Sequence, residues 1–261
     1  MFLQGFHAQS IVSESFEGFL GRGLSIAATA AGMRWLINSI HGLALLCALS
    51  IPVAIFNGTL FSWHPTLMAL AFLGFMAEGV LTSILFRSKE GQDRVRAIQR
   101  HLLLQALAFL CLLGGFYAIY QNKVVHGKEH FKSVHGKFGM ATFILGIVAP
   151  LGGLISFRRM GLLQKFPDKM QPRIKWAHRN IGILTWLLAL VTIQLALTHH
   201  AVWQGWVTRV WQVAVVLLGA LVVVLAWLQP RARPTPAGAD FELVTEPTRK
   251  HTPDLPRTQA V

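Results

Sequence analysis

The sequence predicts an all-α integral membrane protein that crosses the bilayer six times. Hydrophobic residues make up 53% of the 261 positions and charged residues only 13%, against roughly 25% charged in a typical soluble domain. The hydrophobic residues also come in long blocks of about 20, which is the length an α-helix needs to cross a hydrocarbon core of about 30 Å. Because a backbone in lipid must satisfy its own hydrogen bonds, such long blocks predict helices.

The chain divides into three predicted parts. Residues 1–33 lack the early basic cluster of a signal peptide, so the first helix is expected to act as the insertion signal. Residues 34–228 form the membrane domain. Residues 229–261 are rich in proline, threonine and charge and are expected to form a disordered tail. Within the membrane domain, the six expected helices lie at about 34–56, 62–86, 101–120, 135–157, 177–198 and 207–228.

The basic residues orient these helices. The formal net charge is +13, but the lysines and arginines gather in the connections on one side of the predicted bundle and in the tail, so we expect contacts with membrane lipid and no nucleic-acid partner. By the positive-inside rule, this side is cytosolic and both termini lie in the cytosol.

Four consecutive helices each carry a histidine near their start. His64 lies two residues into the second helix, just before Pro65, a residue suited to a helix start because its missing N–H costs nothing there. His101 opens the third helix, His135 opens the fourth, and His178 lies one residue into the fifth. Since consecutive helices run in opposite directions, we expect His64 with His135 near the non-cytosolic face and His101 with His178 near the cytosolic face.

Two imidazoles at one depth favour haem over other metal sites. A zinc site usually has four donors, or three and a water, whereas haem needs only axial ligands, and histidine is a standard one. The chain has no Cys-x-x-Cys-His motif for covalent attachment. The pattern therefore predicts two bis-histidine b haems, an arrangement suited to electron transfer across the bilayer. For any single histidine, a hydrogen bond to a neighbouring helix is the alternative interpretation.

Two further polar residues lie within the predicted helices. Glu78 is 14 residues beyond His64, about 21 Å along a helix, and thus near the inner histidine pair. An intramembrane carboxylate is costly and usually functional, so Glu78 is a candidate for proton uptake; the alternative is a hydrogen bond to another helix, for example to Gln105. His41, in the first helix, is expected to be a structural residue or a haem-propionate contact rather than a ligand.

The segments around the four histidines resemble the cytochrome b561 family of transmembrane, ascorbate-linked electron carriers. The resemblance covers residues of about 38–228 and is greatest to the short members that lack an attached extracellular domain. It rests on "FSWHP" at 61–65, "RHLLLQ" at 100–105, "SVHGKFG" at 133–139 and "KWAHRNIG" at 175–182.

This resemblance implies a central bundle of the second to fifth helices that encloses two b haems. His101 and His178 would hold the inner haem, and His64 and His135 the outer one. Electrons would pass from cytosolic ascorbate through both haems to monodehydroascorbate or a ferric chelate on the far side. Relatives in the family are dimers, so a homodimer is expected.

Basic residues near both predicted haem sites are candidates for substrate binding. A cationic vestibule on the cytosolic side would attract anionic ascorbate, although the same residues also suit lipid headgroups. On the far side, His130, Lys128 and Lys132 lie close before His135 and would attract an anionic acceptor; a solvated loop is the alternative. The cytosolic candidates are Arg87, Arg96, Arg100, Arg173 and Lys175.

Two other functions remain open from the sequence. One is a haem b membrane subunit that oxidises quinol together with partner proteins. The other is a transporter whose histidines carry protons or a cation. The sequence is compatible with an endomembrane (endoplasmic reticulum, vesicle, lysosome or vacuole) or with the plasma membrane.

Overall fold

The structure, a computed structural model, describes residues 4–197 and 205–229. Within these residues, six helices are long and apolar enough to cross a membrane, which confirms the predicted all-α fold with six spans. The predicted tail lies outside the described residues apart from its first position, residue 229.

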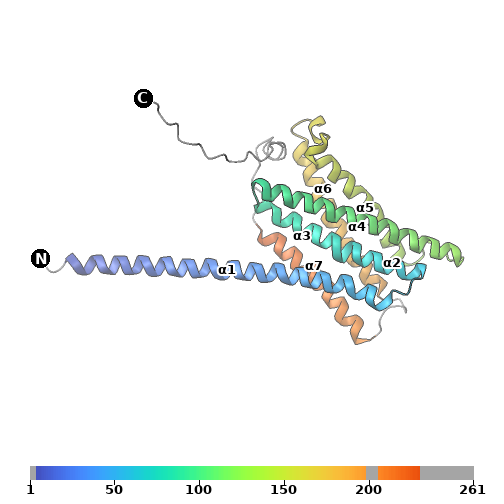
Figure 1. The fold of residues 1–261 in the computed structure, drawn as a ribbon, viewed down its shortest axis with the longest axis horizontal. Coiled ribbons are helices and arrows are strands. Elements are labelled where there is room, and N and C mark those ends of the chain that lie inside the picture. The colour runs from blue at the N-terminus through green and yellow to red at the C-terminus, as the bar shows by residue number, and fades with distance from the viewer. Residues whose placement is uncertain (1–3, 198–204, 230–261) are drawn as a thin grey trace, which may run out of the picture.

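Five of the six spans lie in single helices, and the second is composite (Figure 1). Short 3₁₀ turns connect some of them: η2 (Phe86–Ser88), η3 (Arg158–Met160) and η4 (Leu163–Lys165). The second span consists of α2 (Leu60–Ala69), the π-helical η1 (Leu70–Met76) and α3 (Ala77–Leu85). The others are α1 (Gln4–Ile55), α4 (Gly91–Val125), α5 (Val134–Ser156), α6 (Gln171–Ala196) and α7 (Trp206–Leu228).

Three helices begin earlier than the hydrophobic blocks predicted. The helix α1 starts at Gln4 and extends far from the bundle (Figure 1), α4 starts at Gly91, and α6 starts at Gln171. Hydropathy detects only the part of a helix that lies in hydrocarbon, whereas arginine, glutamine and alanine are good helix formers that continue it into water. As a result, His101 and His178 lie two to three turns inside their helices rather than at the start.

The helices that carry the other two histidines begin at side-chain caps. The Ser62 backbone N–H donates to Thr59 Oγ1 at the start of α2, at 3.3 Å. The Gly136 N–H donates to Ser133 Oγ at the start of α5, at 3.1 Å. Such caps stabilise a helix by about 1 kcal/mol and fix where it begins. They place His64 and His135 within the first two turns of α2 and α5.

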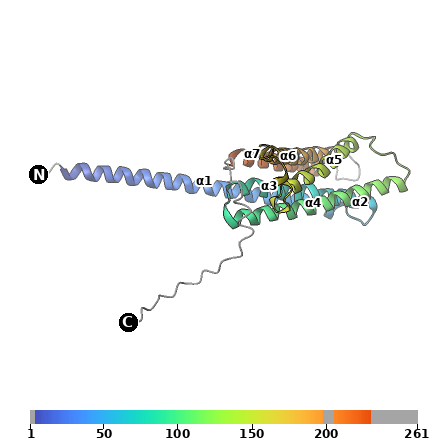
Figure 2. The ribbon, with the colours of Figure 1, turned by 90° about the horizontal axis from the view of Figure 1, so that it is seen from above.

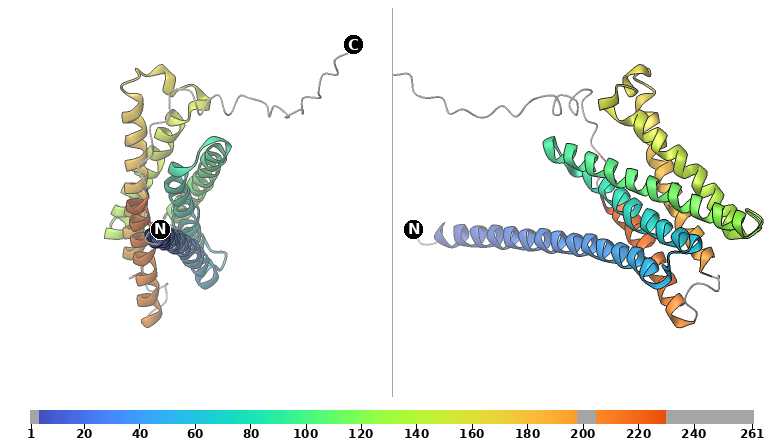
Figure 3. Two further views of the ribbon diagram at one scale, coloured as in Figure 1. Left: turned by 90° about the vertical axis from the view of Figure 1, so that its left-hand side faces the viewer. Right: turned by 45° about the vertical axis from the view of Figure 1, so that its right-hand side comes forward.

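The spans form two layers. Figure 2 shows α5, α6 and α7 in one layer and α2, α3 and α4 in the other. Two views in Figure 3 show the same separation, with α5 packed against α6 and α4 against the second span. Many outward side chains are apolar, including Val53 (87% exposed) and Trp227 (83% exposed), as expected where the outer surface meets lipid.

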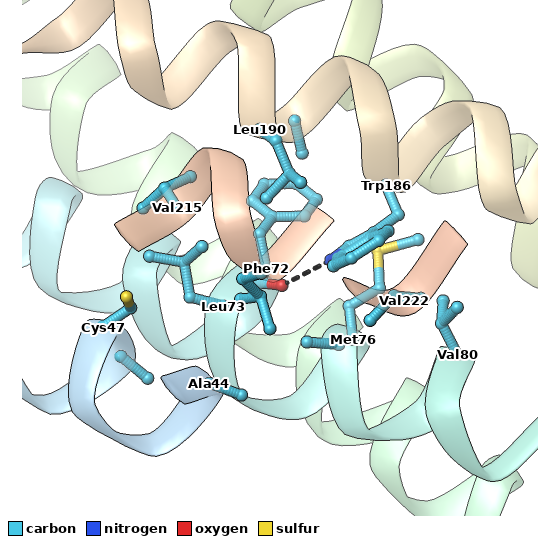
Figure 4. Close-up of a cluster of buried hydrophobic side chains, with 14 of the residues drawn as sticks. Ala44, Cys47, Phe72, Leu73, Met76, Val80, Trp186, Leu190, Val215 and Val222 are labelled. Carbon is cyan, nitrogen blue, oxygen red and sulfur yellow. Dashed lines mark hydrogen bonds between the residues drawn. The ribbon is translucent and has the colours of Figure 1, made fainter. Parts of the chain in front are cut away.

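A buried cluster joins the layers at the centre of the molecule. Figure 4 shows Phe72 and Leu73 of η1 among side chains of α1, α6 and α7. The Trp186 indole N–H donates to the Phe72 carbonyl at 2.9 Å in this buried setting. Wide π-helical turns are rare and occur often at functional sites. Here, the bond ties α6 to η1.

Candidate functional site

The structure brings together the same two histidine pairs that the sequence predicted. His64 of α2 and His135 of α5 have ring centroids 6.2 Å apart and ring planes at 78°. His101 of α4 and His178 of α6 have centroids 6.4 Å apart and planes at 77°. Each pair combines one helix from each layer, so the four rings form two bridges between the layers.

Each histidine is held by a backbone carbonyl of a neighbouring helix in its own layer. A carbonyl can only accept, so the proton lies on Nδ1 in all four rings and the Nε2 lone pair is available to a metal. This second contact fixes both the tautomer and the orientation of the ring. The Nδ1–O distances are 3.0 Å from His64 to Gly115, 2.8 Å from His101 to Gly79, 3.0 Å from His135 to Thr192 and 3.0 Å from His178 to Ala149.

The spacing of the rings fits two imidazoles on opposite sides of one metal ion. An imidazole nitrogen lies about 2 Å from a bound transition metal and about 1 Å from its own ring centre, which gives about 6 Å between the two centroids. The observed 6.2 Å and 6.4 Å match this value. Hence the residues present fit an axial histidine pair at both levels.

Glycines keep the space around these rings open. A Cβ added at Gly153 of α5 would lie 3.0 Å from Cε1 of His178, and one at Gly152 would lie 3.5 Å from His178 Cβ. On α4, a Cβ at Gly115 would lie 3.2 Å from Leu67 Cβ and 3.5 Å from the His64 carbonyl oxygen. Glycine therefore permits the close approach that lets the carbonyls reach the rings.

Residues 63–204, more than half of the chain, match the family described as eukaryotic cytochrome b561. The chain belongs to the cytochrome b561 family. This confirms the resemblance found in the sequence, and the matched region contains all four paired histidines. Membership in this family implies that the chain binds haem b.

Several curated proteins of the family are similar to the chain. It is 35% identical over 150 residues to the mouse transmembrane reductase CYB561D2; the aligned region covers 54% of the chain and 62% of that relative. The human transmembrane reductase CYB561D2 is 30% identical over 191 residues, covering 71% of the chain and 79% of the relative. The transmembrane ascorbate ferrireductase 2 of Arabidopsis thaliana is 29% identical over 133 residues, covering 51% and 54%. The chain thus spans less than two thirds of the length of the mouse relative.

On the inner side, the structure adds two residues that the sequence did not single out. The Phe86 ring lies 6.3 Å from the His101 ring, centroid to centroid. The Arg94 guanidinium lies over the Phe86 ring, 5.7 Å from its centroid. Arg94 precedes His101 by seven residues, which is two helical turns and therefore the same face of α4. That spacing was the signal that could have found it.

The basic residues that the sequence predicts on the cytosolic side differ in burial. Arg87, in η2, is partly buried, and its guanidinium repels that of Arg179. Arg96 pairs with Asp93 at 2.8 Å, where both side chains are more than 70% exposed. Three further candidates are exposed and lie in the helical turns before His101 and His178: Arg100, Arg173 and Lys175.

On the outer side, an aromatic group surrounds one of the predicted acceptor residues. His130 stacks on Tyr120 of α4 at 4.5 Å, and the neighbouring Phe131 has a positive φ of 56°, which is uncommon outside glycine. Phe131 also stacks with Phe116 at 6.5 Å. Phe116 and Tyr120 are four residues apart on α4, so their shared face was visible in the sequence, but their contact with the loop was not.

The two predicted lysines of this loop are solvent-facing. Lys128 is exposed. Lys132 pairs with Glu129 at 3.1 Å, with both side chains more than 70% exposed. An exposed pair of this kind contributes little to stability.

Glu78 has a different partner from the one suggested by the sequence. Instead of Gln105, its carboxylate contacts His41 of α1, whose Nδ1 lies 2.8 Å from both Oε1 and Oε2. The Gln105 side chain lies against Gly79, where an added Cβ would be 2.5 Å from its Nε2. His41 is thus joined to α3, an arrangement that the sequence alone did not predict.

Proposed function

We propose that the chain carries electrons across a membrane, from cytosolic ascorbate to monodehydroascorbate or a ferric chelate on the other side. It would hold two b haems, the inner one between His101 and His178 and the outer one between His64 and His135. When bound, each haem supplies a carrier that accepts and passes on one electron.

One observation carries this proposal. Four helices present two histidine pairs at a spacing that suits axial ligation, and a carbonyl holds the proton of every ring on Nδ1. Axial ligation needs an unprotonated Nε2, which this tautomer provides. A purely structural histidine needs no such uniform arrangement, so the geometry favours ligands over isolated packing residues.

The residues near the inner pair would bind and orient the donor. Ascorbate is an anion near neutral pH, and cations at the mouth of a low-dielectric site raise the local concentration of an anion. Arg87, Arg173 and Lys175 supply such charge together with Arg96 and Arg100. Arg94 lies over Phe86, which in turn lies beside His101, and so adds a further cation on the same face of α4.

The residues near the outer pair would bind the acceptor. His130 stacks on Tyr120 at 4.5 Å, which holds a polar ring in the loop, while Lys128 and Lys132 add positive charge. Both proposed acceptors carry negative charge or carboxylates, so this composition suits either.

The names of relatives support ascorbate as the donor. The Arabidopsis relative is a transmembrane ascorbate ferrireductase, and a pig relative that is 25% identical over 202 residues is a transmembrane ascorbate-dependent reductase, CYB561. The cytosolic position of both termini, the homodimer and the particular membrane stay predictions.

Liposomes test the proposal directly. Purified protein loaded with haem is reconstituted into vesicles that enclose ferric citrate and a ferrous indicator, and ascorbate is added outside. We expect ascorbate-dependent ferrous colour inside, together with reduction of the haem absorption bands. Empty vesicles are the control. Haem bands that remain oxidised with ascorbate but become reduced with a quinol would contradict the proposed donor.

A further inference from the structure

A carboxylate–imidazole pair lies outside the two histidine pairs. It joins Glu78 of α3 to His41 of α1, with Nδ1 at 2.8 Å from both carboxylate oxygens. The second span ends at Ser88, and Glu78 lies ten residues before that end, which is about 15 Å along the helix. An ionisable group at such a depth is costly to charge and is usually functional. The contact with His41 gives the Glu78 carboxylate a hydrogen-bond donor at this depth.

The His41–Glu78 pair is linked to His101 through the backbone of Gly79. Gly79, the next residue after Glu78, offers the carbonyl that accepts the Nδ1 proton of His101 at 2.8 Å. A change of charge at Glu78 or His41 therefore arises next to the bond that orients a proposed ligand. Charges interact more strongly here than in water, because the surroundings are of low dielectric constant.

We propose that the His41–Glu78 pair binds one proton for each electron that the His101–His178 site receives and releases it when the electron leaves. This inference rests on the proposed function. In the proposed cycle, the pair holds a carboxylate and a neutral imidazole before the electron arrives, with one negative charge in all. The proton then adds to Nε2 of His41 and makes the pair neutral, so the added electron is balanced within the same region.

The geometry favours His41 as the position of the second proton. Its Nδ1 already points at both oxygens of Glu78, so the imidazole can take a proton on Nε2 without breaking that contact. The side chain of His41 is 47% exposed and that of Glu78 is 28% exposed at the surface of the helix bundle. Both side chains therefore lie outside the packed core of the bundle.

Most of the charged groups on the other elements packed against α3 are cations. η1 has no titratable side chain, and α7 has only Arg209, near its N-terminal end. η2 contributes Arg87, and α1 contributes Arg34 and the buried Cys47 among its residues from 29 onward, besides His41 itself. On α4, the acid Asp93 already pairs with Arg96. In the first ten residues of α6, the titratable groups are Arg173, Lys175, His178 and Arg179. In the first eleven residues of α4, they are Asp93, Arg94, Arg96, Arg100 and His101.

Redox titrations at several pH values test this inference. In the wild-type protein, we expect the midpoint potential of the inner haem to fall as pH rises, by up to about 59 mV per unit, since one proton per electron shifts the one-electron equilibrium tenfold per pH unit. The outer haem should show a smaller slope. In Glu78→Gln and His41→Gln, the slope of the inner haem should be largely lost. Glu90→Gln, which neutralises an exposed carboxylate at the start of α4, should keep the wild-type slope.

The results separate this inference from the proposed function. Wild-type protein with two haems and a pH-independent inner potential overturns the inference alone. So do Glu78→Gln and His41→Gln variants that keep the wild-type slope, or that both lose haem, since the pair would then be structural. Wild-type protein that binds no haem overturns the proposed function itself.

Discussion

The glycine beside His178 illustrates how single residues define the inner site. Gly153 leaves room for the imidazole edge, since a Cβ there would lie 3.0 Å from Cε1. Its neighbour in the same helix, Ala149, supplies the carbonyl that holds His178 Nδ1. One face of α5 therefore both orients the ring and makes space for it.

Gly153→Val should displace His178 and weaken binding at the inner site. Overpacking of this kind costs about 1–3 kcal/mol, so a marked loss of inner haem is expected while the outer haem stays. Haem content and the absorption spectrum of purified protein measure this. Gly32→Val is the control, because nothing lies within 4 Å of a Cβ built there and α1 carries none of the four paired histidines; equal loss in both variants would argue against a specific role for Gly153.

Arg94 and Arg96 should differ in their effect on the donor. Arg94→Gln removes a cation held over Phe86 at 5.7 Å, a contact worth about 0.5–2 kcal/mol. We expect the ascorbate concentration for half-maximal reduction rate to rise by up to about tenfold. Arg96→Gln removes an exposed ion pair worth at most about 1 kcal/mol and should raise this ascorbate concentration less than Arg94→Gln does. Stopped-flow measurement of haem reduction at increasing ascorbate concentration checks this; a larger effect of Arg96→Gln than of Arg94→Gln would contradict the prediction.

At the scale of the helices, the second span departs most from its predicted form. Its hydrophobic block predicted one continuous α-helix, but η1 interrupts it with a π-helical segment between His64 and Gly79. Hydropathy reports only that such residues are apolar and does not report the turn width. The Trp186–Phe72 contact that accompanies it joins residues 114 positions apart, so no local pattern reveals it.

Trp186→Phe tests how much this contact matters. The change keeps an aromatic ring but leaves the buried Phe72 carbonyl without its indole donor, at a cost of about 1–3 kcal/mol. The thermal midpoint, followed by loss of the haem bands in detergent, should fall. The control is Trp176→Phe, on the same helix but 60% exposed, which should have little effect. An unchanged midpoint for Trp186→Phe would mean that the contact contributes little.

For the whole molecule, the sequence predicted the fold class, the spans and the grouping of the histidines. These follow from two general constraints: the thickness of the bilayer and the alternating direction of consecutive helices. The carbonyl partners, the contact of Glu78 with His41 and the stack of His130 on Tyr120 were not predicted. They depend on which helices become neighbours and how each is rotated, which only the packed structure defines.

The two layers share one plan at both faces of the membrane domain. Within a layer, a carbonyl orients each histidine; between the layers, the histidines face each other in pairs. Loss of one histidine should therefore empty one site and leave the other, because the sites use different rings and different carbonyls.

The most direct test of the two-site account is the number of haems per chain, measured by the pyridine haemochrome assay. We predict two in the wild-type protein and one in each of His64→Ala and His101→Ala, whereas His126→Ala, in the exposed loop after α4, should keep two. One haem in the wild-type protein, or two in either paired-histidine variant, would contradict the account.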